Sequence, residues 1–248
     1  MIKKKHIYII GLFLTLLTPL KKIKASFFSR PRKITQSIYA TILGKKDASP
    51  KYKKLIKKAL LDFEVNPSYV AIKQMNSVGP RIAGCPLASF TKYGIWINEE
   101  ALATYSNEEL EFQMYHEAAH YASKDHLKEL ISFTLLSIVA TYPAYHTFAQ
   151  SQGYKRIILT PTTLLITSVG GYHLFTKLIR SFEKKADLAA AKKLCIRNKK
   201  DTVIKYIHLL QNQIDQGQNN DYNVWHPSII EQEKYLSEFI TQWEAINS

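Results

Sequence analysis

Residues 106–120 read Ser-Asn-Glu-Glu-Leu-Glu-Phe-Gln-Met-Tyr-His-Glu-Ala-Ala-His, and this stretch decides the fold around it. Ser106 followed three residues later by Glu109 is a capping box, an arrangement that satisfies the free amide groups at the start of a helix. The sequence therefore predicts a helix from about Asn107 to Leu127.

The end of this stretch carries a metal-binding pattern, His116-Glu117-Ala118-Ala119-His120. Histidines four residues apart project from the same face of a helix, so the two imidazoles can bind one zinc ion. Glu117 stands beside that ion and can take a proton from zinc-bound water, whose pKa the metal lowers to about 7. The alternative is that two surface histidines share this spacing by chance. We favour a zinc metallopeptidase.

A catalytic zinc ion needs a third protein ligand, and Glu183 is the best candidate. It opens the run Glu183-Lys184-Lys185-Ala186-Asp187, in which the two carboxylates share one face of a predicted helix. We expect Glu183 to bind the single zinc ion of the chain, and Asp187 to accept a hydrogen bond from a ligand histidine. The alternative is that Glu183 and Asp187 have no metal-binding role and are solvated carboxylates beside lysines.

Three apolar segments indicate a membrane protein. Residues 1–25 combine a basic start with a short apolar run, as in a signal peptide or an uncleaved signal anchor. Residues 130–149 and 157–175 are each about long enough to span a bilayer. A buried helical hairpin in a soluble protein is the alternative for this pair. We expect an integral protein, of the cell membrane, in contact with lipid.

Composition bears on the binding partners, the cysteine chemistry and the number of domains. The chain has 248 residues and a net charge of +14, but its lysines are scattered, so we expect no nucleic-acid partner. Cys85 and Cys195 lie far apart in the sequence, which indicates neither a disulfide framework nor a cysteine metal site. We expect residues 26–248 to form one catalytic domain.

The other segments are predicted from periodicity and turn residues. Residues 26–77 are basic and read as helical, residues 78–90 are turn-rich, and residues 93–98 form a short strand. Ile95, Trp96 and Ile97 of this strand are candidate substrate-binding residues, because a strand edge can pair with an extended peptide. Further helices are expected up to about Ile196, over residues 201–214, and after His226-Pro227.

Four features together resemble the membrane-associated zinc metallopeptidases of family 48, which include the bacterial heat-shock protease HtpX and the CAAX prenyl endopeptidases. They are the entry to the zinc helix at residues 95–109, the His116 to His120 pattern, the run Arg180-x-x-Glu183-x-x-Ala186-Asp187, and His226-Pro227. The resemblance extends over about residues 78–236.

This resemblance implies a mainly α-helical fold with a small β-sheet, a gluzincin-type zinc peptidase domain interrupted by a transmembrane helical hairpin. It implies His116, His120 and Glu183 as zinc ligands and Glu117 as the general base. His226 would stabilise the oxyanion formed during hydrolysis. The expected function is an endopeptidase acting on protein substrates at a membrane. The alternative is an inactive membrane protein that keeps the fold to bind partners, and the side of the membrane stays open.

Overall fold

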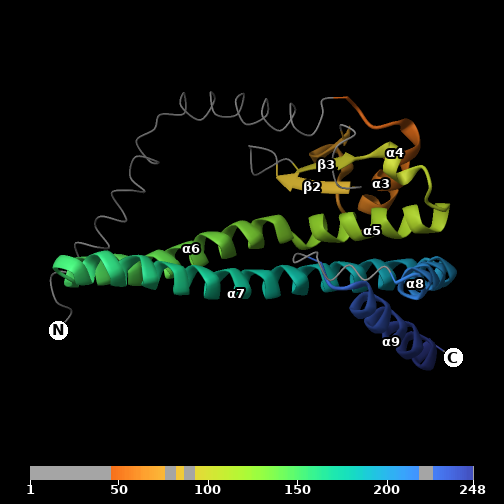
Figure 1. Cartoon of the computed structure of the whole chain (residues 1–248). Helices are drawn as coiled ribbons and strands as arrows, with labels where there is room; N and C mark the ends of the chain where they lie inside the picture. The colour runs from red at the N-terminus through yellow and green to blue at the C-terminus, as the bar shows by residue number, and fades with distance from the viewer. Residues whose placement is uncertain (1–45, 76–81, 87–92, 218–225, 248) are drawn as a thin grey trace. The chain divides into compact units, whose positions relative to one another are not determined.

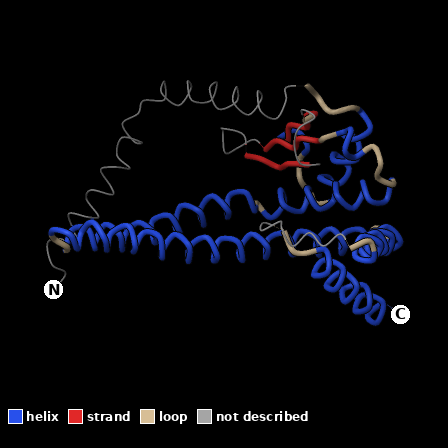
Figure 2. The backbone as a smooth tube through the Cα atoms, viewed as in Figure 1, coloured by secondary structure: helices blue, strands red, loops and turns tan. Residues whose placement is uncertain are grey.

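The computed structural model of the chain describes residues 46–75, 82–86, 93–217 and 226–247, so the predicted signal or anchor at residues 1–25 lies outside them. The chain divides into two units. One comprises residues up to Asp47 together with Tyr69–Asn98, and the other comprises Ala48–Ser68 and Glu99–Ser248. Helices make up most of the described chain, as Figure 2 shows. The described strands all belong to the first unit. The predicted mainly α-helical fold with a small sheet is confirmed.

The first unit contains a three-stranded sheet in the order β1-β3-β2, formed by Val70–Gln74, Tyr93–Ile97 and Ile82–Pro86. Strand β1 runs parallel to β3, and β2 runs antiparallel to it.

Two of these strands were not predicted. The sequence predicts helix over residues 26–77, yet Val70–Gln74 forms β1, in which two β-branched residues suit the pleated backbone. It predicts turns over residues 78–90, yet Ile82–Pro86 forms β2. Glycine and proline are tolerated there because β2 lies at the edge of the described sheet.

The strand predicted to bind substrate is the central one. Both edges of β3 are hydrogen-bonded, one to β1 and the other to β2, and Ile95, Trp96 and Ile97 are buried. Gly94 leaves the space that the Trp96 ring occupies, since a Cβ at Gly94 would come within 2.3 Å of that ring. Residues 95–97 thus hold the described sheet together through both neighbouring strands, and substrate binding by Ile95, Trp96 and Ile97 stays a prediction.

The second unit is helical (Figure 1). Its helices are α3 (Pro50–Asp62), α4 (Glu99–Leu102), α5 (Asn107–Ser123), α6 (Asp125–Gln150), α7 (Gly153–Ile196), α8 (Lys200–Asp215) and α9 (Ile229–Asn247). The expected helices over residues 201–214 and after His226-Pro227 are confirmed as α8 and α9.

Helix α5 begins as predicted and ends earlier. The Ser106 hydroxyl accepts a hydrogen bond from the Glu109 amide at 3.2 Å, and the Glu109 carboxylate accepts one from the Ser106 amide. The predicted end at Leu127 is wrong, because Lys124 adopts a left-handed conformation with φ of 57° that stops α5 at Ser123. Few residues other than glycine adopt this conformation, and here it starts α6 in a new direction.

Helices α6 and α7 lie side by side as an antiparallel pair (Figure 1). The Thr167 hydroxyl on α7 donates a hydrogen bond to the Ala140 carbonyl on α6 at 2.7 Å, and the rings of Phe133 and Phe175 meet edge to face. Helix α7 is continuous for 44 residues, so the apolar run 157–175 and the polar segment that carries the predicted third ligand form one rod.

Small residues let α5 and α7 approach each other closely. Ala118 and Ala119 on α5, and Ala186 and Ala190 on α7, are buried between packed helices. Phe112 of α5 stacks on Tyr206 of α8 with ring centroids 4.0 Å apart, so α8 also packs against α5. This packing brings one face of α5 against the C-terminal part of α7.

We predict that Ser106→Ala lowers the stability of the protein by about 1 kcal/mol, because it removes one half of the capping box. For a chain of this size the unfolding temperature of the detergent-purified protein should fall by about 2–4 °C. Ser106→Asp, which keeps an acceptor at the same place, should stay close to the unsubstituted protein. An equal loss in both variants would contradict the assigned role of the hydroxyl.

Candidate metal centre

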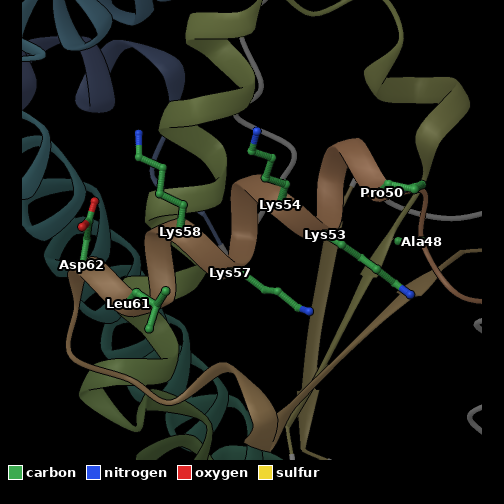
Figure 3. Close-up of a pocket in the computed structure, with 8 residues that line it drawn as sticks. All are labelled: Ala48, Pro50, Lys53, Lys54, Lys57, Lys58, Leu61 and Asp62. Carbon is green, nitrogen blue, oxygen red and sulfur yellow. The ribbon is translucent and has the colours of Figure 1, made fainter.

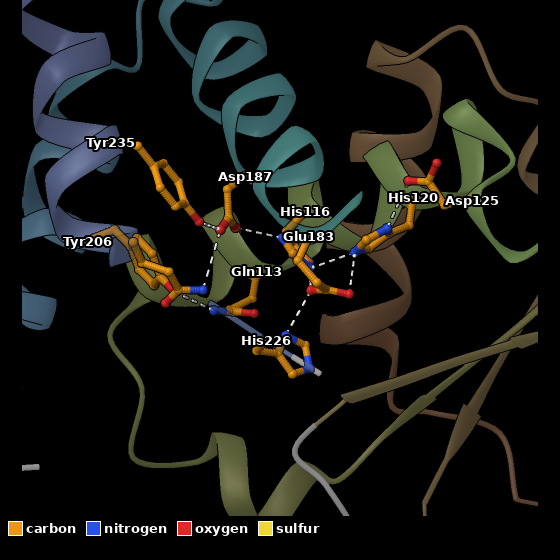
Figure 4. Close-up of polar contacts among 10 residues, drawn as sticks. Gln113, His116, His120, Asp125, Glu183, Asp187, Tyr206, His226 and Tyr235 are labelled. Atoms are coloured by element: carbon orange, nitrogen blue, oxygen red, sulfur yellow. Dashed lines mark hydrogen bonds and ion pairs between the residues drawn. The ribbon is translucent and has the colours of Figure 1, made fainter. Parts of the chain in front are cut away.

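Three buried side chains from two helices converge on one point, as Figure 4 shows. The Nε2 atoms of His116 and His120 on α5 lie 3.0 Å apart. The two carboxylate oxygens of Glu183 on α7 each lie 3.4 Å from one of these nitrogens. One ligand atom from each residue lies within 4.8 Å of the others, which is compatible with a shared metal ion.

A carboxylate behind each imidazole fixes its orientation. Nδ1 of His116 donates a hydrogen bond to Oδ1 of Asp187 at 2.7 Å, and Nδ1 of His120 donates one to Oδ2 of Asp125 at 3.0 Å. With both Nδ1 atoms acting as donors, both Nε2 atoms of the neutral rings carry lone pairs. The two lone pairs and the Glu183 carboxylate therefore face one another.

This arrangement fits a cation. Two acceptor nitrogens and a carboxylate at contact distance repel one another unless a positive charge lies between them. In addition, Oε2 of Glu183 is fully buried, and its close contacts within the described residues are to ring nitrogens of His116 and His226. Two imidazole nitrogens and one carboxylate form a donor set suited to a divalent transition metal such as zinc.

The pKa values of the three side chains also indicate that this cluster favours a positive charge. Burial lowers the pKa of His116, but the nearby Asp187 and Glu183 carboxylates outweigh it and hold this pKa well above the ordinary value. Burial and the neighbouring His116 lower the pKa of His120, but its contacts with Asp125 and Glu183 raise it to about 9. Burial raises the pKa of Glu183, whereas the surrounding histidines bring it far below the ordinary value. A proton thus takes the cation's place in the metal-free protein.

Asp187 belongs to a wider polar network that connects the metal cluster with side chains of α9. Its Oδ2 accepts a hydrogen bond from the Tyr235 hydroxyl and a longer one, at 3.4 Å, from Nε2 of Gln232. Burial and the adjacent Asp187 charge raise the pKa of Tyr235 well above its ordinary value, so the hydroxyl remains a donor. The carboxylate that holds His116 is itself held by two side chains of another helix.

Two residues, Glu117 and His226, were predicted to act on the substrate. Glu117 follows His116 on α5 and is half-buried. His226 precedes α9, and its side chain is 47% exposed, with Nδ1 only 2.8 Å from Oε2 of Glu183. The structure thus brings His226 beside the predicted metal ligands, whereas residues 95–97 belong to the other unit.

Asp125 is the site residue that the sequence reading missed. On a continuous helix a residue five positions after His120 would point about 140° away from it, because each residue turns the helix by about 100°. The left-handed Lys124 breaks the helix and turns Asp125 back toward the ring. Lys128 donates a hydrogen bond to the other oxygen of Asp125 at 2.9 Å, so this carboxylate is also held from behind.

A separate cavity of about 710 Å³ lies along α3 (Figure 3). Its lining residues are Ala48, Pro50, Lys53, Lys54, Lys57, Lys58, Leu61 and Asp62. None of the predicted site residues lines it. Among the described residues, the group that could hold a metal ion lies between α5 and α7.

The helical unit and its buried His-His-Glu cluster define a protein with a candidate single-metal centre. The family model described as peptidase family M48 matches residues 54–238, and the chain belongs to this family, as the sequence motifs predicted. Membership supports a peptidase activity. Searches of curated proteins and of solved structures gave no match.

We predict that the metal-free protein loses stability as the pH rises through about 9. The folded-state pKa of His120 is raised to about 9. The stabilisation from its proton is therefore complete below the ordinary histidine pKa and disappears above the folded-state value. Unfolding midpoints in chelator between pH 6 and pH 10 should show this fall. His120→Asn should flatten the pH dependence, and an unchanged slope in that variant would contradict the assignment.

Proposed function

We propose that this chain is a zinc-dependent endopeptidase that hydrolyses peptide bonds of protein substrates at a membrane. The observation that carries the proposal is the convergence of two oriented histidine lone pairs and one buried carboxylate on a single point. Family membership supports the peptidase reaction, and the donor set supports the metal.

His116, His120 and Glu183 would hold one zinc ion per chain and leave a fourth position open for water or substrate. When bound, zinc supplies a Lewis acid that polarises the scissile carbonyl and lowers the pKa of its water. Asp187 and Asp125 keep the two imidazoles in the ligating tautomer and orientation.

Two further residues would handle the proton and the developing charge. Glu117, next to the first ligand, would act as general base, taking a proton from the attacking water and giving it to the leaving amine. His226 would donate a hydrogen bond to the oxyanion of the tetrahedral intermediate, a place that its position beside Glu183 supports.

The helical pair α6 and α7 supports the membrane setting. Within the described residues, α7 is long and apolar enough to cross a bilayer, and none of its apolar window is buried in the protein. Both helices carry large exposed hydrophobic side chains, among them Phe133, Leu135, Leu165 and Ile166. Such a large apolar surface is rare on soluble monomers. We therefore propose an integral protein of the cell membrane, with residues 130–149 and 157–175 in contact with lipid.

We predict that Glu117→Gln abolishes casein cleavage without removing zinc. Loss of a general base should lower kcat by about 10²–10⁴-fold. Glu108→Gln, in the first turn of the same helix, where the carboxylate pairs with Lys205 outside the metal cluster, serves as the control and should stay near the unsubstituted rate. Zinc content by mass spectrometry separates a catalytic loss from a metal loss. A zinc-loaded unsubstituted protein that cleaves no substrate would instead support an inactive, partner-binding protein.

We predict that Asp125→Asn weakens zinc binding by about 10–100-fold, because the variant loses the carboxylate that orients His120. Competition with a chromogenic chelator measures the dissociation constant directly. Asp201→Asn, in the first turn of α8 and outside the site, is the matched control and should leave the constant unchanged. Unaltered affinity in Asp125→Asn would show that the orienting contact contributes nothing.

A further inference from the structure

A second cavity, of about 490 Å³, lies between α7 and α9 and shares no residue with the metal cluster. Its walls are Lys177, Arg180, Ser181 and Lys184 on α7, with Pro227, Glu231, Lys234, Tyr235 and Glu238 on and before α9. The α7 residues recur every three or four positions, so they share one face of the helix. We call this cavity the α7–α9 groove.

The charge of the α7–α9 groove favours an anionic ligand. Basic side chains outnumber acidic ones, and Glu231 is already engaged in a capping box with Ser228 before α9. The Lys184 ammonium lies 5.0 Å from the centre of the Tyr235 ring, and both residues line the groove. Lys177 and Lys234 are exposed, one on each wall, and make no ion pair with the described residues.

The position of the groove along α7 identifies the source of that anion. Lys177 and Arg180 follow Phe175, the end of the proposed membrane segment, by two and five residues. At 1.5 Å per residue they lie about 3 Å and about 8 Å beyond it. The headgroup layer on each side of a bilayer is about 5–8 Å thick. The mouth of the groove would therefore lie at the depth of lipid phosphates.

We propose that the α7–α9 groove binds the headgroup of an anionic phospholipid. The inference rests on the proposed membrane insertion of α7. Lysines and arginines at the membrane surface attract anionic lipids, and basic pockets beside membrane helices bind their headgroups. A bound lipid would join α7, which carries Glu183, to α9, which carries Tyr235, and so brace the two helices around Asp187.

The test uses the full chain in detergent, titrated with phosphatidylglycerol or phosphatidylcholine and followed by native mass spectrometry. The unsubstituted protein should bind phosphatidylglycerol preferentially, and Lys177→Gln/Lys234→Gln should bind it about tenfold more weakly. The matched control is Lys54→Gln/Lys57→Gln, which removes the same charge from the cavity along α3 (Figure 3). This control should keep the preference.

Other outcomes would overturn the proposal. An equal loss in both double variants would mean that overall charge attracts the lipid, and a protein without preference would mean that the groove has no headgroup site. Displacement of the lipid by millimolar inorganic phosphate would assign the groove to free phosphate. Two separate measurements test the proposed function independently of lipid binding. Extraction from membranes by high salt without detergent would refute membrane insertion. Casein cleavage would test the peptidase activity.

Discussion

The site depends on a pair of hydrogen bonds from the histidine Nδ1 atoms to Asp187 and Asp125. These bonds leave a lone pair on each Nε2 atom and aim both at Glu183, which creates a concentration of negative potential inside the helical unit. A metal ion or a proton must balance it. The packing of α5 on α7 through buried alanines brings the histidines of one helix close to the Glu183 carboxylate of the other.

The continuity of α7 connects this site to the proposed membrane. A single helix carries an exposed apolar segment in its first half and Glu183 and Asp187 in its second half. The metal centre is therefore attached rigidly to the part of the chain that would contact lipid. Tyr235 and Gln232 link the same carboxylate to α9, so that three helices hold one imidazole in place.

Local patterns predicted most of the site and some of the fold. The capping box located α5, helical spacing paired His116 with His120, and the carboxylates of α7 were found because their spacing repeats that of a helix face. Asp125 escaped prediction because its contact depends on a left-handed backbone at Lys124, which nothing in the local sequence requires. Strand β1 was read as helix because its partner β3 lies about twenty residues away, and pairing at that distance leaves no local periodicity.

The most direct test of the metal centre is the zinc content of the purified chain and of Glu183→Ala. Glu183 is the ligand that joins the two helices, and without it two histidines alone would hold zinc weakly. Mass spectrometry of the metal should give one zinc ion per unsubstituted chain and almost none in the variant after dialysis. A variant that retains as much zinc as the unsubstituted protein would contradict the assignment of Glu183 as a ligand.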